Sequence, residues 1–153
     1  DWSSDVCSSD LRRAIDFFKT KGVMETNQNS QKRIFDLEER LIDFAICIIE
    51  ISENLHTSPA GKHISGQVVR SGTAPALNYG EAQSAESRND FIHKVKIILK
   101  ELRETRISLK IIKKYPLTDK SDIVEKALNE CNELTAIFNK SVETAKKNNE
   151  KNK

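Results

Sequence analysis

Two pairs of a carboxylate and a histidine are the residues in this chain whose spacing could bind a metal ion. Glu53 and His56 are three positions apart, as are Asp90 and His93, and di-iron helical bundles use carboxylate and histidine pairs of this kind. In the helical register of their apolar neighbours, however, both pairs point outward, whereas the metal ligands of a bundle point into its core. We therefore expect surface polar residues here and no bound metal.

The chain also lacks the other patterns that would indicate an enzyme. Its sequence contains no serine–histidine–aspartate or cysteine–histidine arrangement and no glycine-rich phosphate loop. We expect no catalytic residues and no cofactor. The sequence instead favours a protein that binds or assembles with others.

A run of basic side chains between Lys94 and Lys114 could bind an anionic partner. Lys96, Arg103 and Lys110 recur every seven residues, so they form one stripe on a helix that could lie along phosphates. Because the net charge is only +2, binding of RNA or DNA must come from this local stripe. We predict nucleic-acid contact at Lys96, Lys100, Arg103, Arg106, Lys110 and Lys113. The alternative is a solvated helix face, since the stripe has no aromatic side chain for base stacking.

Four stretches of apolar residues at alternating steps of three and four must position these groups. The first stretch is Ile34, Leu37, Leu41, Phe44, Ile48, Ile51 and Leu55. This spacing keeps one stripe of a helix against its neighbours, and 153 residues fit a single domain. The sequence therefore predicts an all-α fold, an antiparallel up-and-down four-helix bundle. Its second helix should be kinked near Pro75, because the proline ring displaces the carbonyl four residues earlier.

Capping residues and turns mark the ends of the predicted helices. The first helix covers about residues 31–55, and Ser58–Pro59 begins the second as an N-cap followed by proline at the first helical position. The third covers 88–114 behind a capping box at Ser87–Asp90. The fourth follows the turn at 118–121.

Two of these helices carry apolar residues outside the inward stripe. We predict an oligomer interface at Phe35, Ile42, Ile46, Ile49, Ile97, Ile107 and Ile111. At about 25 cal/mol per Å², these side chains represent a few kcal/mol for any surface that covers them. The alternative is a core wider than one stripe, which would bury the same positions within one chain.

The two ends of the chain differ from the bundle. Residues 1–23 open with DWSSDVCSSDL, which resembles translated sequencing-adapter DNA, so we expect a non-native leader and a biological start at Met24. The alternative is a short amphipathic helix over residues 12–21. We place the bundle at 24–147 and a disordered basic tail at 148–153.

The sequence also predicts the compartment. Its apolar runs are too short to cross a membrane, so we expect no membrane association. Cys7, Cys47 and Cys131 show no paired spacing and leave one thiol over. This pattern suits the reducing cytoplasm better than a disulfide framework.

The segment from Ser65 to Ala82 carries, in order, an arginine, small residues, a proline, an asparagine and a glutamate. The named residues of this series are Arg70, Pro75, Asn78 and Glu81. The order resembles a signature of the four-helix-bundle family encoded in intervening sequences of bacterial 23S rRNA genes. Two later segments, LKELRET at 99–105 and ECNEL at 130–134, are similar to the same family. The resemblance covers about residues 34–147.

The resemblance implies an antiparallel four-helix bundle that assembles into a homopentamer in characterised relatives, in a family to which no catalytic activity is assigned. A structurally similar relative is the accessory protein of diversity-generating retroelements, a strongly basic pentameric barrel that binds nucleic acid and a reverse transcriptase. The near-neutral charge of this chain differs from that relative. Nucleic-acid binding therefore does not carry over directly.

Four polar residues lie within or close to these motifs. We interpret Arg70, Asn78, Glu81 and Glu101 as a structural polar network between the second and third helices, since a buried arginine must be paired. The alternative is a small-ligand site or a minor enzyme site at the kinked second helix. Our prediction for the whole protein is a non-enzymatic, cytoplasmic, oligomeric scaffold or interaction protein that contacts RNA or DNA through its third helix.

Overall fold

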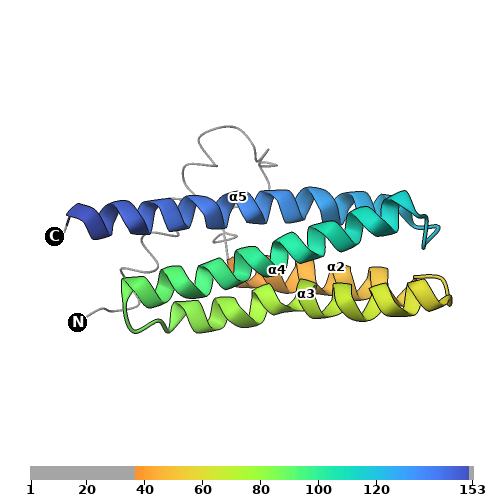
Figure 1. Ribbon diagram of the computed structural model, residues 1–153, viewed down its shortest axis with the longest axis horizontal. Helices are drawn as coiled ribbons and strands as arrows, with labels where there is room; N and C mark the ends of the chain where they lie inside the picture. Colours follow the sequence, from red (N-terminus) through yellow and green to blue (C-terminus); the bar gives the residue numbers. More distant parts are fainter. Residues whose placement is uncertain (1–36, 152–153) are drawn as a thin grey trace, which may run out of the picture.

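The computed structural model describes residues 37–151, which form four long helices packed side by side (Figure 1). In chain order they are α2 at Leu37–Glu53, α3 at Pro59–Gln83, α4 at Arg88–Lys114 and α5 at Ser121–Lys151. No strand occurs within this part of the chain. The predicted all-α four-helix bundle is confirmed.

Short loops join the helices, so consecutive helices run antiparallel and lie next to each other. α3 packs against α2 and α4, whereas α5 packs against α4 and, less extensively, against α2. α2 and α4 therefore lie on one diagonal of the bundle, and α3 and α5 on the other. The α2–α3 and α4–α5 loops lie at the same end (Figure 1). They are tied together there, because the His56 N–H donates to the Leu117 carbonyl at 2.7 Å.

The starts of α3 and α4 agree with the predicted capping residues. The Ser58 hydroxyl accepts a hydrogen bond from the Gly61 N–H at 3.0 Å, and α3 begins one residue after this serine. The Ser87 hydroxyl accepts from the Asp90 N–H at 3.1 Å, and the Asp90 carboxylate accepts from the Glu86 N–H at 3.1 Å. These bonds satisfy N–H groups that a helix start leaves unpaired, which fixes where each helix begins.

Pro75 lies inside α3, as predicted, and the helix continues past it to Gln83 without a break. A proline has no N–H, so the Ser71 carbonyl loses its partner within the helix. The proline is buried in the bundle. Packing against the neighbouring helices therefore holds α3 together across the missing hydrogen bond.

The core consists of apolar side chains from all four helices, and most of the predicted inward positions that the structure describes are buried. Its largest fully buried side chains are Phe44, Phe91, Phe138, Leu41, Ile48, Ile98, Leu102, Leu109, Ile112, Leu134, Ile137 and Val68. Phe138 on α5 meets Tyr79 on α3 edge to face, with ring centroids 6.1 Å apart. Gly72 allows α3 to approach α2 closely, because a Cβ at this position would lie 2.6 Å from a methyl carbon of Ile48.

α5 extends further than the sequence indicated. We expected a disordered tail from residue 148, whereas the helix continues to Lys151. The side-chain amide of Asn149 donates a hydrogen bond to Asn89 at 2.8 Å. This contact with the first turn of α4 gives the end of α5 a partner that a periodicity analysis does not reveal.

Several predictions concern residues that the structure does not describe, namely 1–36, 152 and 153. They include the non-native leader, the first residues of the first predicted helix, and Phe35 of the predicted oligomer interface. Within residues 37–151, no helix combines the length and the apolar character that a membrane crossing needs.

Candidate functional site

α2 presents isoleucines to solvent on the side that faces away from the core. Ile46 is 56% exposed, and Ile42 and Ile49 are also exposed. The three residues are spaced by four and three, so they form one stripe along the helix. We call these three residues the α2 isoleucine face. Within residues 37–151 the core is not wide enough to bury them, which the sequence left open.

α3 carries two glycines that no contact within the described chain requires. A Cβ added at Gly66 or Gly80 would meet nothing within 4 Å, in contrast to Gly72. A glycine inside a helix destabilises it by about 0.5–1 kcal/mol relative to alanine. Both positions therefore weaken α3 without improving the packing of a single copy.

The C-terminal end of α4 combines apolar and basic side chains on its exposed surface. Ile107, Lys110, Ile111, Lys114 and Tyr115 line a shallow hollow of about 320 Å³. Ile107, Ile111 and Tyr115 are all exposed, and the tyrosine is 69% exposed. We call these five residues the α4 end patch.

Ile97 differs from the other isoleucines of the predicted interface, because it is half-buried. Tyr115 was missed by the sequence reasoning, which found no aromatic residue in the basic stripe. Its spacing from Ile107 and Ile111, eight and four residues, was the available signal.

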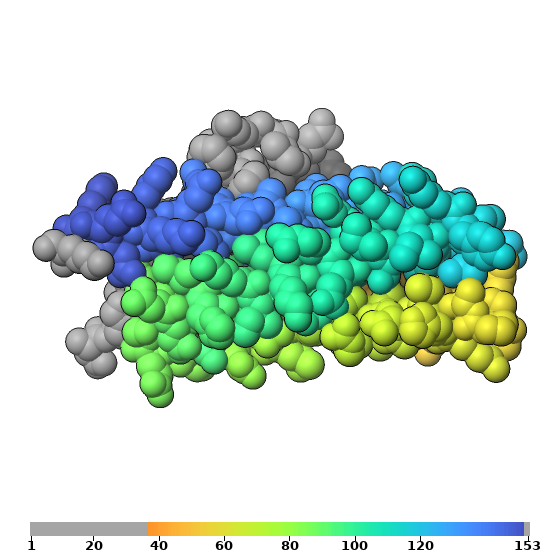
Figure 2. Space-filling view, in the orientation of Figure 1, coloured from red at the N-terminus to blue at the C-terminus, as the bar shows by residue number. Residues whose placement is uncertain are grey.

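The predicted nucleic-acid residues lie along α4, which crosses the face of the molecule shown in Figure 2. Arg106 is half-buried and the other five are exposed. Lys100 pairs with Glu104 at 3.8 Å and Lys113 pairs with Glu125 at 2.5 Å. Within residues 37–151, Lys96, Arg103 and Lys110 have no carboxylate in ion-pair range. These three cations, at heptad spacing, are available to an anionic partner.

The four polar residues predicted to form one network are divided between two places. Arg70 on α3 pairs with Glu104 at 2.8 Å and approaches Glu101 at 3.7 Å, whereas Glu81 pairs with Lys94 at 3.5 Å. In the described part of the chain, no hydrogen bond or ion pair joins Asn78 or Glu81 to Arg70.

The expectation that Arg70 is buried is wrong, because its side chain is 58% exposed. The arginine lies on the solvent side of the α3–α4 contact, where its long side chain reaches water. The buried polar link between α3 and α4 is instead a hydrogen bond of 2.9 Å between the hydroxyls of Thr105 and Ser71.

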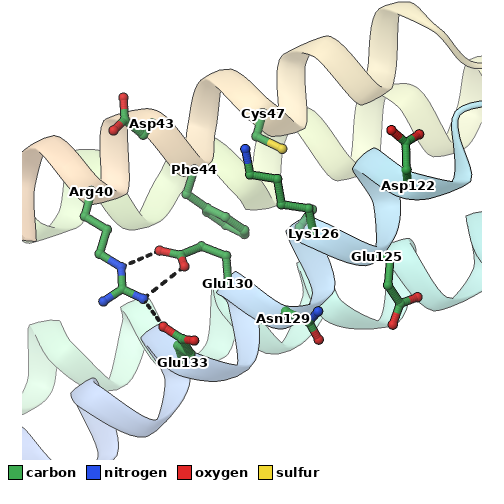
Figure 3. A pocket seen from close by; sticks show the side chains of 11 residues that line it. Arg40, Asp43, Phe44, Cys47, Asp122, Glu125, Lys126, Asn129, Glu130 and Glu133 are labelled. Atoms are coloured by element: carbon green, nitrogen blue, oxygen red, sulfur yellow. Dashed lines mark hydrogen bonds and ion pairs between the residues drawn. The ribbon is translucent and has the colours of Figure 1, made fainter. Parts of the chain in front are cut away.

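A groove separates α2 from α5 (Figure 3). It has a volume of about 610 Å³. Its lining residues are Arg40, Asp43, Phe44 and Cys47 from α2, and Asp122, Glu125, Lys126, Ala127, Asn129, Glu130 and Glu133 from α5. Five of these eleven side chains are carboxylates and two are basic. We call this feature the α2–α5 groove.

Arg40 bridges the α2–α5 groove. Its guanidinium donates hydrogen bonds to the carboxylates of Glu130 and Glu133 (Figure 3). Burial alone would lower the pKa of Arg40, but the hydrogen bonds and charges of these two carboxylates outweigh it and the pKa is raised. Arg40 therefore stays charged and neutralises part of the acidic groove. The sequence reasoning did not find this site, although five of the 17 residues of α2 are acidic and only Arg40 is basic.

The two described cysteines lie in different surroundings. Cys131 is buried between α4 and α5, where its S–H donates to the Leu102 carbonyl at 3.2 Å, and burial raises the pKa of its thiol to about 11. Cys47 is half-buried in the wall of the α2–α5 groove, and burial raises the pKa of this thiol as well. Cys7 lies outside the described residues.

The two carboxylate and histidine pairs lie at helix ends. Glu53, His56 and His93 are exposed, and Asp90 is half-buried and accepts a hydrogen bond as part of the α4 cap. His56 approaches Asp119 at 3.5 Å. In the part of the chain that the structure covers, no three His, Cys, Asp or Glu side chains come together as a metal site would require.

Comparisons with known proteins agree with this architecture. A family model described as 23S rRNA-intervening sequence protein matches residues 35–140. A protein with unknown function from the S23 ribosomal protein family of Bacteroides thetaiotaomicron is 30% identical in sequence, and its crystal structure superposes with a TM-score of 0.60. That match covers 66% of this chain and 93% of the other. No protein of curated function matches this sequence. The chain therefore belongs to the 23S rRNA-intervening sequence protein family.

Proposed function

We propose that this protein is a non-enzymatic cytoplasmic scaffold that works as a homo-oligomer, with the α2 isoleucine face covered by another copy. The observation that carries the proposal is the exposure of Ile42, Ile46 and Ile49 on a helix whose inward side already buries Leu41, Phe44 and Ile48 in the core. Burying an isoleucine side chain contributes about 1.5–3 kcal/mol. Three partly exposed isoleucines in one stripe thus give a second copy a substantial apolar surface.

The exposed glycines of α3 support the same proposal. Gly66 and Gly80 leave backbone surface open where no neighbour among the described residues uses it. Small residues allow another helix to approach closely, which would compensate for their low helix propensity. The assembly that the family resemblance implies is a pentamer.

Sedimentation velocity over a range of concentrations tests self-association. The intact protein should sediment as an oligomer, and Ile46→Glu should sediment as a monomer with unchanged helical circular dichroism, because a carboxylate in an apolar interface is desolvated without a partner. Asn139→Glu is the matched control, since it adds the same charge at another exposed helical position. A wild-type protein that remains monomeric at its highest soluble concentration would refute the proposal.

A second function, contact with RNA or DNA through α4, is supported by three cations that have no ion pair among the described residues. Lys96, Arg103 and Lys110 share one exposed helix face, and an oligomer would repeat this stripe in every copy. Filter binding of a labelled RNA at several salt concentrations tests this. The change of Lys96 and Arg103 to glutamine should weaken binding and reduce the dependence on salt by about two counterions.

Glutamine at Lys146 and Lys147, two exposed lysines of α5, provides the matched control for the RNA experiment. Equal losses in both double variants would contradict a specific role for α4.

The alternative of a ligand or enzyme site around Arg70, Asn78 and Glu81 has less support. The charges of Arg70 and Glu81 are already engaged by Glu104 and Lys94.

A further inference from the structure

We propose that the α4 end patch of one copy docks into the α2–α5 groove of a second copy, so that the protein associates head to tail. This inference rests on the proposed self-association and names two surfaces that would meet. The α4 end patch is apolar and basic, and the α2–α5 groove is lined by five carboxylates against two basic side chains, Arg40 and Lys126. The two surfaces therefore carry opposite net charge.

The charges of the helices are segregated across the bundle. α4 carries nine lysines and arginines but three acidic residues, whereas α2 carries five acidic residues and one arginine. α2 and α4 lie on a diagonal of the bundle, so their charges cannot neutralise each other within one copy. A second copy can bring α4 to the acidic side, and complementary potentials of this kind favour association and fix its orientation.

The α2–α5 groove retains free negative charge at its rim. Glu130 and Glu133 are engaged by Arg40, and Glu125 by Lys113. Asp43 and Asp122 have no ion pair within the described residues, and Figure 3 places them at opposite ends of the groove. Phe44 and Ala127 also line the groove but are buried, at 2% and 1% exposed, so the half-buried Cys47 is the apolar side chain that reaches it. An incoming group with an apolar centre and two cations would satisfy both kinds of surface.

The α4 end patch is such a group. Lys110 and Lys114 are exposed and have no ion pair within residues 37–151. Ile107, Ile111 and Tyr115 provide its apolar centre. An exposed tyrosine is a common anchor of protein interfaces, because its ring buries a large area and its hydroxyl still finds a polar partner. In the docked arrangement the two lysines face the carboxylates of the rim, and Tyr115 enters the groove between them.

A second copy explains the α4 end patch better than nucleic acid does. Two isoleucines interrupt the basic stripe here and offer nothing to phosphates. Lys96, Lys100 and Arg103, nearer the start of the helix, remain outside the patch, whereas the docking takes Lys110 from the stripe proposed to bind nucleic acid. Because the patch and the groove are different surfaces, each copy would use both at once. Such a contact generates a closed ring or a filament instead of a two-fold dimer.

Charge exchange between the two surfaces tests the docking. One variant changes Lys110 and Lys114 to glutamate, and another changes Asp43 and Asp122 to lysine. At low salt each variant alone should associate at least about tenfold more weakly than the wild type in sedimentation equilibrium. The variant with all four changes should recover association, because the patch is then acidic and the groove rim basic. The change of Lys146 and Lys147 to glutamate is the matched control and should associate like the wild type.

Circular dichroism and thermal unfolding establish that each variant is folded. If the lysine substitutions unfold the protein, Asp43→Asn with Asp122→Asn should still weaken association, by less than the reversal. Association of the four-change variant that is no stronger than that of its parents would overturn the docking, as would wild-type association in either parent.

The controls separate the docking from the function on which it rests. If Ile46→Glu prevents self-association and the charge variants do not, the scaffold proposal stands and the docking is wrong. If the wild type is monomeric, both fail. Loss of RNA binding without loss of self-association on changing Lys110 and Lys114 would assign the patch to nucleic acid and also overturn the docking.

Discussion

The α3–α4 and α2–α5 contacts differ in how completely two neighbouring helices close against each other. α3 and α4 have the most extensive contact in the bundle, with the buried hydrogen bond between Ser71 and Thr105 at its centre. α2 and α5 are the least extensive of the four neighbouring pairs, and a groove of about 610 Å³ lies between them. The same kind of apolar periodicity thus produces one closed seam and one open seam.

The residues beside the inward stripes explain this difference. Along α3 these positions hold small residues such as Ser71 and Gly72, so its neighbours approach closely. The facing sides of α2 and α5 hold long charged side chains, among them Arg40, Glu130 and Glu133, and these keep the backbones apart while bridging them. Small flanking residues close a seam, and paired charges leave a seam that water or a partner can enter.

Phe138 and Phe44 offer the largest test of this comparison. Phe138 is fully buried against Tyr79 in the closed part of the core, so Phe138→Ala should lower the free energy of unfolding by about 3–5 kcal/mol. Phe44→Ala should cost less, because Phe44 borders the α2–α5 groove and the space left can merge with it. Urea denaturation measures both variants. A larger loss for Phe44→Ala would show that the α2–α5 seam is as closed as the rest.

The pH dependence of stability provides a second test, through the thiol buried between α4 and α5. The pKa of Cys131 is about 11 in the folded protein, above its usual value of 9.0, because the buried thiolate is desolvated. The thiol therefore stabilises the fold fully below the unfolded pKa. This contribution declines as the pH rises toward the folded pKa, since the unfolded chain loses a proton that the folded chain keeps.

Between about pH 8 and pH 10.5 this effect should remove about 2 kcal/mol of unfolding free energy. Urea denaturation of the wild type and of Cys131→Ala at both pH values measures it, because other groups titrate equally in the two proteins. Identical pH dependence would contradict the burial of this thiol.

With Cys7 replaced by serine, Cys47 should react with a thiol reagent much faster than Cys131, as expected for the more open seam.

The hydrogen bond between Thr105 and Ser71 should contribute a smaller amount. Thr105→Val keeps the shape of the side chain but removes the hydroxyl that Ser71 contacts at 2.9 Å, so stability should fall by about 1 kcal/mol. Ser71→Ala removes the other partner. Combining the two substitutions should cost less than the sum of the single losses, because either substitution alone already breaks this bond; the remaining hydroxyl keeps its own helix carbonyl, that of Glu101 for Thr105 at 2.9 Å and that of Val68 for Ser71 at 3.5 Å. Strict additivity would show that the two hydroxyls do not act together.

Arg40→Met should have the smallest effect on global stability and a clear local one. Its ion pairs with Glu130 and Glu133 are partly solvated, so the global loss should be about 1 kcal/mol or less. Amide hydrogen exchange should accelerate in α2 and remain unchanged in the middle of α4, since the bridge across the open seam is lost. Lys140→Met, which removes an ion pair with Glu143 within α5, is the control. Equal acceleration throughout the bundle would mean that α2 does not open separately.

The fold could be predicted in detail because its signals are local. Ser58 and Ser87 cap the helices that they were expected to cap, and the heptad spacing of residues such as Leu41 and Phe44 identified the buried side of α2. Helix period, capping and proline placement each depend on a few adjacent residues. A single sequence contains that information.

The candidate surfaces were harder to predict because they depend on which helices become neighbours. The pairing of Arg40 with Glu130 links residues far apart in the chain. Tyr115 has helical spacing from Ile107 and Ile111, but it follows the last residue of α4, so its place in the α4 end patch also depends on the path of the chain there. Periodicity places Arg70 on α3, but how far its side chain reaches into water depends on the packing of α4 beside it. The exposure of Ile46 likewise depends on the width of the bundle.

The hydrogen bond from the His56 amide to the Leu117 carbonyl determines how α2 can move. It anchors one end of α2 to the α4–α5 loop, so a swing of α2 away from α5 must pivot about that end and is widest near Leu37. The groove would therefore open most at the end where Arg40 lies, and the hydrogen bonds of Arg40 with Glu130 and Glu133 are contacts that oppose this opening.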